Sequence, residues 1–282
     1  MKSLPTAVRG LAFSARAACS LPTTVNSLRS AGAHPLQKSF METSNPALRA
    51  GALERFGKVA AGDATMTVNG TATKTLVLLL VTTFSAGVVW ISNPEQYRSI
   101  MMIGAIGGLI MALATTFKPM WAPITAPLYA VLEGMALGAV SAIYNASYKG
   151  LPMMAVAATM VTAILMFALY RTRIIKVTDR MRSVASMALL GLLGTYLLQF
   201  ILGLFGVQMP FINGNGILGI GFSLLATGLA SFFLLLDMDQ VERMATSRLP
   251  KSMEWYGAFS FLVTLVWLYL EMLRLLSKLT RR

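Results

Sequence analysis

Acidic side chains in or beside long apolar runs are the groups of this sequence that could do chemistry. They are Glu133, Asp237, Asp239, Glu242 and Glu271. A charge at the centre of a bilayer costs roughly 2.5 to 3.5 kcal/mol on insertion scales, so an acid in such a place needs a function or a partner. We take Asp237, Glu271 and Glu133 as candidate groups for sensing protons or cations, with Asp239 and Glu242 as secondary candidates.

Glu133 lies near the middle of the apolar run 121–144. One interpretation is a proton or cation ligand in an internal cavity. The other is a protonated acid that is hydrogen-bonded to a neighbouring helix. Both stay open at the level of the sequence.

Residues 237–242, which we call the acidic hinge, follow directly on the apolar run 217–236. Asp239 stands four residues before Arg243, the spacing of an ion pair on one helix face, which favours a structural role for Asp239. Asp237 directly follows the apolar run, so we expect it to be the acid of the hinge that is most shielded from water.

The elements that position these acids are apolar runs long enough to cross a hydrocarbon core of roughly 30 Å at 1.5 Å per residue. They are residues 75–91, 99–117, 121–144, 152–170, 183–207, 217–236 and 255–276. With 56% hydrophobic residues, 12% charged residues and a mean hydropathy of +0.66, the chain is too apolar for a soluble domain. We predict an all-α integral membrane protein, a bundle of seven transmembrane helices over residues 75–282 that contacts the lipid bilayer.

Glycines are spaced for close packing of two of these helices. Gly134 and Gly138 form a GxxxG pair in the third run, and Gly104, Gly107 and Gly108 crowd the second. Small residues let helix backbones approach each other in lipid, so we predict that these faces are buried between helices.

The net charge of +13 does not indicate a nucleic-acid partner. The basic residues lie in an N-terminal leader and in short loops between apolar runs, where positive charge sets the orientation in the membrane. Loop 171–182 contributes most to this bias and places the segment before the first run on the inner side and the C-terminus on the outer side.

Cys19 and His34 are the only cysteine and histidine, and both precede the apolar runs. The remaining chain therefore lacks the residues for disulfides, for Cys/His metal sites and for Ser/His or Cys/His catalysis. An intramembrane aspartyl protease needs two aspartates that face each other at depth, whereas Asp237 and Asp239 are crowded into one hinge. We expect neither an enzyme nor a resident metal or cofactor.

Residues 1–43 have the composition of an organelle transit peptide, rich in Arg, Ser and Ala with no acidic residue before Glu42. A disordered basic tail is the alternative. We expect import into a mitochondrion, with the inner membrane as the destination and a plastid membrane as the alternative. Residues 44–74 are mixed and polar and contain several glycines, so we predict a polar N-terminal arm.

Several separated motifs resemble one family. They are LDMDQVE at 236–242, MEWYGAF at 253–259, LYLEMLRLL at 268–276, SNPAL at 44–48, MTVNG at 66–70 and LEG at 132–134. Together they resemble the Bax inhibitor family, specifically its bacterial YccA-like branch, from about Ser44 to Arg282. The resemblance implies the seven-helix fold of that family.

The resemblance also implies a role for Asp237. In the family, the aspartate that Asp237 matches is paired with a second acid in the last span, and their shared proton gates a pH-dependent cation leak. Two close carboxylates cannot both ionise freely and titrate as a unit. The literal match makes Glu271 the second acid, but it comes 34 residues after Asp237, a longer separation than in the bacterial channel-type members. Matching without an insertion instead puts Thr264 at that position.

The geometry of the last run leaves the partner of Glu271 open. If the helix begins near Trp255, Glu271 lies roughly 24 Å along it, toward the membrane face opposite Asp237. Arg274, three residues on, and Glu133 are the other partners to consider for Glu271.

Two functions follow from the resemblance. The first is a pH-sensitive Ca²⁺ leak channel or Ca²⁺/H⁺ exchanger, or a pathway for another cation. Its support in the sequence is intramembrane acid without balancing intramembrane base, which suits a hard cation. The second is an interaction protein that restrains a membrane-embedded ATP-dependent (AAA) protease or suppresses cell death (apoptosis), with the arm 44–74 as the contact.

Overall fold

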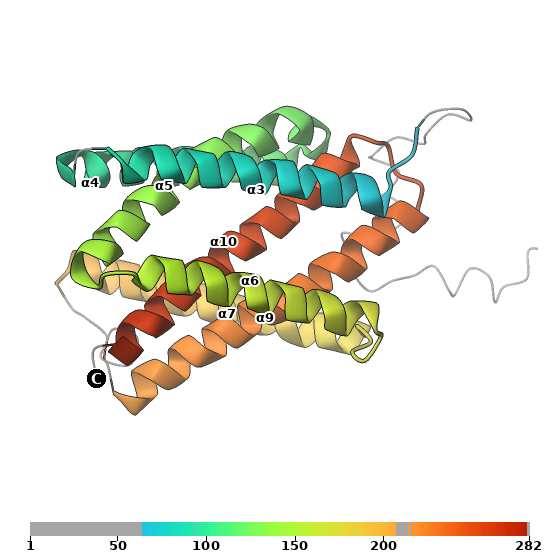
Figure 1. Ribbon diagram of the computed structural model, residues 1–282. Helices are drawn as coiled ribbons and strands as arrows, with labels where there is room; N and C mark the ends of the chain where they lie inside the picture. Colours follow the sequence, from blue (N-terminus) through green and yellow to red (C-terminus); the bar gives the residue numbers. More distant parts are fainter. Residues whose placement is uncertain (1–63, 93, 207–213, 215, 281–282) are drawn as a thin grey trace, which may run out of the picture. The chain divides into compact units, whose positions relative to one another are not determined.

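The computed structural model describes residues 64–92, 94–206, 214 and 216–280 (Figure 1). Within this part of the chain, seven helices are long and apolar enough to cross a membrane. They are α3 (Val68–Trp90), α4 (Tyr97–Phe117), α5 (Ala122–Ser147), α6 (Leu151–Arg171), α7 (Asp179–Leu204), α9 (Ile217–Thr246) and α10 (Met253–Thr280). Single 3₁₀ turns, η1 (Pro94–Gln96) and η2 (Pro119–Trp121), flank α4. The predicted all-α, seven-span architecture is confirmed.

The first helix starts earlier than its apolar run. Thr67 is the N-cap of α3, and its Oγ1 accepts a hydrogen bond from the backbone N–H of Gly70 at 3.0 Å. The helix thus takes in residues 68–74, which the sequence assigned to the polar arm. The predicted transit peptide 1–43 and residues 44–63 of the arm lie outside the described residues.

The acidic hinge is helical. α9 continues past Leu236 to Thr246, so Asp237, Asp239 and Glu242 lie in its last turns and do not form a break. A helix of 30 residues is about 45 Å long and exceeds a hydrocarbon core of roughly 30 Å. Its charged turns can therefore extend beyond the core, and Asp239 pairs with Arg243 one turn on, which keeps the segment helical.

Helices α5 and α10 are the packing centres. α5 packs against α3 and α4, and α10 packs against α3, α5, α6 and α9, so α10 runs between the two groups of helices in Figure 1. Tyr129 of α5 and Phe259 of α10 meet edge to face, with ring centroids 5.1 Å apart. α7 packs mainly on α9 and is the least buried of the spans.

The predicted glycine faces are confirmed as close contacts. A Cβ on Gly134 would lie 2.5 Å from the carbonyl oxygen of Thr82 in α3, and one on Gly138 would collide with the backbone of Ala86. A Cβ on Gly104 would lie 2.6 Å from the carbonyl oxygen of Leu132. Glycines of α5 at the contact with α3, and a glycine of α4 at the contact with α5, therefore let these helices approach each other at backbone distance.

Candidate functional site

One face of α10 carries the polar groups that define the candidate site. Its residues recur every three or four positions, which places them on one stripe of the helix. They are Tyr256, Ser260, Thr264, Trp267, Glu271 and Arg274. The stripe lines a pocket of about 610 Å³ that residues of α4, α7 and α9 complete, and Asp237 is one of them. The pocket therefore contains both of the acids that the sequence ranked first in the last two spans.

Asp237 is buried on α9 and is held by two hydroxyl groups of α10. Ser260 Oγ donates to Oδ1 at 2.7 Å, and Thr264 Oγ1 donates to Oδ2 at 2.6 Å. Ser260 and Thr264 stand one helical turn apart, so one face of α10 supplies a donor to each carboxylate oxygen. The orientation of Asp237 is thus fixed, and each oxygen keeps acceptor capacity for a further proton or cation.

Glu271 is 1% exposed and has three donors around it. Tyr196 of α7 donates its hydroxyl to Oε1 at 2.7 Å, and Trp267 Nε1 donates to the same oxygen at 3.2 Å. Arg274 Nη1 donates to both carboxylate oxygens at 3.2 Å and also to the Tyr196 hydroxyl. The Arg274 guanidinium lies 4.7 Å from the centre of the Tyr196 ring. Glu271 is therefore a buried, ion-paired group.

Asp237 and Glu271 do not bond to each other. Among the partners considered from the sequence, the structure places Thr264 against Asp237 and Arg274 against Glu271. Because α9 is helical beyond Leu236, Asp237 meets α10 at Ser260 and Thr264, well inside the helix. Glu271 follows Thr264 by two turns, roughly 10 Å, so the two acids share a pocket. Glu271 therefore lies further along α10 than Asp237, as expected, but by only about two helical turns.

The expectation of intramembrane acid without balancing base is wrong. Arg274 pairs with Glu271 inside α10. Lys278, which the sequence assigned to the C-terminal tail, lies buried in the last turns of α10. Its Nζ donates to the carbonyl oxygen of Gly219 at 2.9 Å and to Ser223 Oγ at 2.7 Å. Lys278 was assigned to the tail because the apolar run ends at residue 276, whereas α10 continues to Thr280. Arg274 lies within the run and was considered only as a partner of Glu271.

Glu133 lies apart from these acids. It lines a smaller pocket of about 330 Å³ together with Met101, Ala136 and Leu270. Gly108 of α4 makes room for it, since a Cβ there would lie 2.8 Å from Glu133 Oε2. No hydrogen bond or ion pair joins Glu133 to the described residues, in contrast to the interpretation as an acid hydrogen-bonded to a neighbouring helix.

Asp239 and Glu242 belong to an ionic cluster beside the pocket. Asp239 Oδ2 accepts from Arg243 Nε at 2.7 Å and from Arg182 Nη2 of α7 at 2.5 Å. Glu242 accepts the hydroxyl of Tyr170 from α6. The predicted Asp239–Arg243 pair is confirmed, and these acids hold the end of α9 against α6 and α7.

Glu254 was missed as a functional candidate by the sequence analysis. It is 2% exposed in the first turn of α10 and accepts hydrogen bonds at 3.0 Å from both the backbone N–H and Oγ1 of Thr67. Lys74 of α3 forms an ion pair with it, and a Cβ on Gly70 would collide with its carboxylate. The signal was the presence of MTVNG and MEWYGAF among the matching motifs, which here meet in space.

Within the described residues, no three His, Cys, Asp or Glu side chains gather closely enough to hold a metal ion. A Ca²⁺ ion prefers six to eight oxygen ligands. In this pocket it would meet one or two carboxylates and complete its shell with hydroxyls and water, which suits a passing ion better than a stored one.

The profile of the family described as Bax inhibitor 1 like matches residues 28–281. Comparison with curated proteins and comparison with solved structures gave no match.

Proposed function

Because the chain belongs to the Bax inhibitor 1 like family and is a multi-pass membrane protein, we propose that it is a pH-sensitive cation pathway, with Ca²⁺ as its ion, acting as a leak channel or a Ca²⁺/H⁺ exchanger. The observation that carries the proposal is that Asp237 and Glu271 line one pocket between α9 and α10. The proposal assigns no enzymatic reaction and no cofactor. It places the protein in the mitochondrial inner membrane, with a plastid membrane as the alternative.

The chemistry of the pocket supports a hard cation. Asp237 brings a carboxylate whose two oxygens each hold one hydroxyl donor, and Ser260 and Thr264 can turn their oxygens toward an ion as neutral ligands. Glu271, two turns away, is neutralised by Arg274. A cation at Asp237 would therefore meet one uncompensated charge, which binds it without trapping it.

Protons act on the same atoms. A proton and a hard cation compete for the carboxylate oxygens of Asp237, so occupancy by one excludes the other. Arg182, which lies close enough to act electrostatically on Asp237, is itself tied to Asp239. The pocket binds a cation when Asp237 is ionised and does not when Asp237 is protonated. The flux therefore depends on pH.

The test is Ca²⁺ flux into liposomes that carry the purified chain from Ser44, measured from pH 6 to 8. We expect flux that changes with pH, and we expect Asp237→Asn to abolish the pH dependence. Glu271→Gln and Glu133→Gln show whether either acid contributes. Asp179→Asn is the matched control, because it is the same change at an exposed acid of α7 that lies outside the pocket. Absence of flux above protein-free liposomes, from folded protein, would refute the proposal.

A second candidate is a non-transporting regulator of a membrane-embedded AAA protease or of cell death. The observation that favours it is how the segment before α3 is attached. Met66 N–H donates to the Leu249 carbonyl at 2.8 Å, and Thr65 pairs with Pro250 as a β-bridge. These contacts hold Thr65 and Met66 next to the α9–α10 loop.

Deleting residues 44–63 separates the two candidates, because it leaves Thr65, Met66 and their partners in place. If the chain regulates a protease through this arm, the deletion abolishes protease binding in a pull-down while flux is unaffected. If the chain is only a cation pathway, the pull-down finds no protease with or without residues 44–63.

A further inference from the structure

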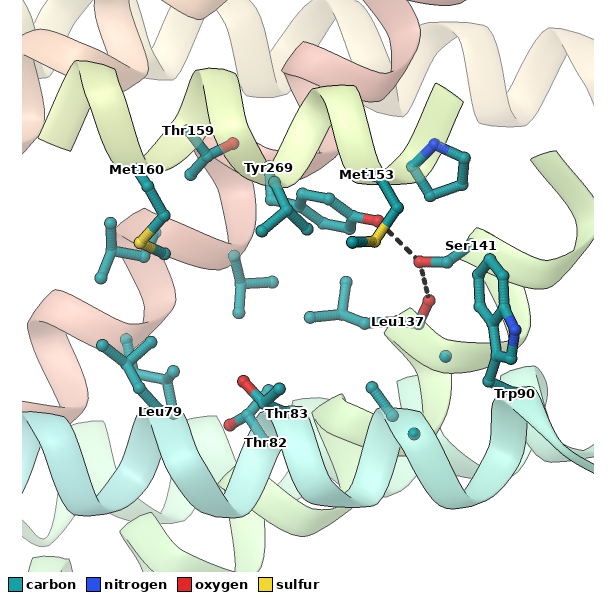
Figure 2. A pocket seen from close by; sticks show the side chains of 18 residues that line it. Leu79, Thr82, Thr83, Trp90, Leu137, Ser141, Met153, Thr159, Met160 and Tyr269 are labelled. Carbon is teal, nitrogen blue, oxygen red and sulfur yellow. Dashed lines mark hydrogen bonds between the residues drawn. The ribbon is translucent and has the colours of Figure 1, made fainter. Parts of the chain in front are cut away.

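A third cavity, chemically different from the pocket of Asp237 and Glu271, lies on the other side of α10. It is a crevice of about 290 Å³ with α3 and α6 as its walls and α5 and α10 as its floor (Figure 2). Met153 and Met160 of α6 point into it from one side, and Leu79, Thr82 and Thr83 of α3 point into it from the other. Met153 and Met160 are also exposed on the outer surface of the bundle, so the crevice opens toward the lipid.

Four of the five hydroxyl groups that line the crevice are already satisfied by the protein, all except that of the exposed Thr83. Ser141 donates to the Leu137 carbonyl at 2.5 Å, so the Tyr269 hydroxyl, 2.7 Å away, donates to Ser141. Thr82 and Thr159 each donate to the carbonyl four residues earlier in their own helix. Water enters cavities whose polar groups lack partners, and these four groups have partners. Apart from the Thr83 hydroxyl and the Trp90 indole, the remaining lining is aliphatic or thioether, so the crevice suits hydrocarbon better than water.

The length and position of the crevice match one leaflet of a bilayer. Along α3 it runs from Leu79 to Trp90, about 16 Å at 1.5 Å per residue, which is close to half of a hydrocarbon core of roughly 30 Å. Trp90 is the last residue of α3, and tryptophans at helix ends lie at the membrane interface. Pro152, at the start of α6, lines the crevice as well. The crevice thus extends from the interface toward the bilayer midplane.

We infer that this crevice binds one acyl chain of a bilayer phospholipid, from the leaflet at the C-terminal end of α3, with the lipid headgroup at the level of Trp90. The chain would pack against Val266 and Tyr269 of α10 and fill the open space at Gly87, where a Cβ would have no neighbour within 4 Å.

Helical geometry connects this site to the ion pocket. Val266 and Tyr269 lie on the face of α10 roughly opposite Ser260, Thr264 and Glu271, at 100° per residue. An acyl chain in the crevice therefore packs against one face of α10, while the opposite face of the helix holds Asp237. The effect of the lipid on flux rests on the proposed function, but its binding does not.

The experiment uses the chain from Ser44 in phosphatidylcholine liposomes that contain a phosphatidylcholine with a diazirine halfway along one acyl chain. After illumination, mass spectrometry locates the label. We expect it to concentrate in the crevice segments of α3 and α6 relative to exposed α7. We expect Gly87→Leu, which fills the crevice, to lower that labelling by about tenfold. Gly191→Leu on α7 is the matched control, since its Cβ also meets open space and lies outside the crevice.

Met153→Trp fills the crevice from α6 and keeps the test decisive if Gly87→Leu does not fold. Equal labelling of α3, α6 and α7, or labelling that survives both crevice-filling variants, overturns the inference. So does labelling of the crevice by a free diazirine fatty acid but not by the phosphatidylcholine. Because labelling needs no ion flux, a failure here is distinct from a failure of the proposed function.

Discussion

Replacing Lys74 by methionine removes the cation that faces the buried carboxylate of Glu254, and we expect the protein to lose stability. Lys74 lies on α3 and Glu254 in the first turn of α10. Their ion pair therefore joins two helices through residues that are 180 positions apart in the sequence. After the change, Glu254 keeps only the two hydrogen bonds from Thr67. The variant is destabilised because its folded state contains a buried carboxylate that has lost its neutralising cation.

The size of the effect follows from the burial of the two partners. Removing one partner of a buried ion pair costs about 3 to 5 kcal/mol. Glu254 is 2% exposed but Lys74 is 18% exposed, so we take the lower end, about 3 kcal/mol. For a domain of this size, 1 kcal/mol lowers the midpoint of thermal unfolding by about 2 to 4 °C, so we expect a fall of roughly 6 to 12 °C.

Thermal unfolding in detergent, followed by tryptophan fluorescence, measures this change. Trp255 is a local reporter, because Lys74 Nζ lies 5.6 Å from its ring centre. Lys118→Met is the matched control. Lys118 lies 4.2 Å from the centre of the Trp121 ring, is exposed and forms no ion pair with the described residues, so its loss costs about 1 kcal/mol or less.

The double variant Lys74→Met/Glu254→Gln tests the pairing itself. It removes both charges, so we expect it to recover part of the loss, with a coupling free energy of about 0.5 to 3 kcal/mol. The reasoning is refuted if Lys74→Met destabilises no more than Lys118→Met, or if the two single changes are additive.

Two further predictions concern packing and the environment of Glu271. Gly138→Leu should prevent a monodisperse fold on size exclusion, because a side chain there collides with the backbone of Ala86, whereas Gly194→Leu, with open space around its Cβ, should elute as the native chain does. Tyr196→Phe should lower the free energy of unfolding by about 1 to 3 kcal/mol, because it removes the hydroxyl that links Glu271 and Arg274 but keeps the ring. Tyr97→Phe, which removes a hydroxyl bonded only to backbone carbonyls near a helix end, should have a smaller effect in the same denaturation assay, and equal losses would contradict the role of Tyr196.

The number of spans could be predicted from the sequence because hydropathy is a local property. Helix ends could not, because they depend on partners distant in the chain. α9 continues to Thr246 because Arg182 of α7 and Arg243 together neutralise Asp239. α3 starts at Val68 because Glu254 accepts a hydrogen bond from Thr67 and forms an ion pair with Lys74. Neither helix end can be predicted from the hydropathy of α9 or α3 alone.

The candidate site was predictable in its acids and not in its contacts. The importance of Asp237 followed from its place beside an apolar run and from the family resemblance. Thr264 emerged as a position to consider, but Ser260 did not, because its relation to Asp237 depends on how α9 and α10 pack. The distance between Glu271 and Asp237 depends on the same packing, so the sequence alone left the partner of Glu271 open.

Cysteine accessibility on α10 tests the central claim most directly, that a water-accessible cation pocket and a lipid-filled crevice lie on opposite sides of this helix. The chain from Ser44 lacks Cys19, so an introduced cysteine is the only thiol. Val263 lines the ion pocket and Leu265 lines the crevice, and both are half-buried. We predict that Val263→Cys reacts with a cationic, water-soluble thiol reagent in liposomes, that Ca²⁺ slows this reaction, and that Leu265→Cys stays unmodified. An unreactive Val263→Cys, or equal reaction at both positions, would contradict the account.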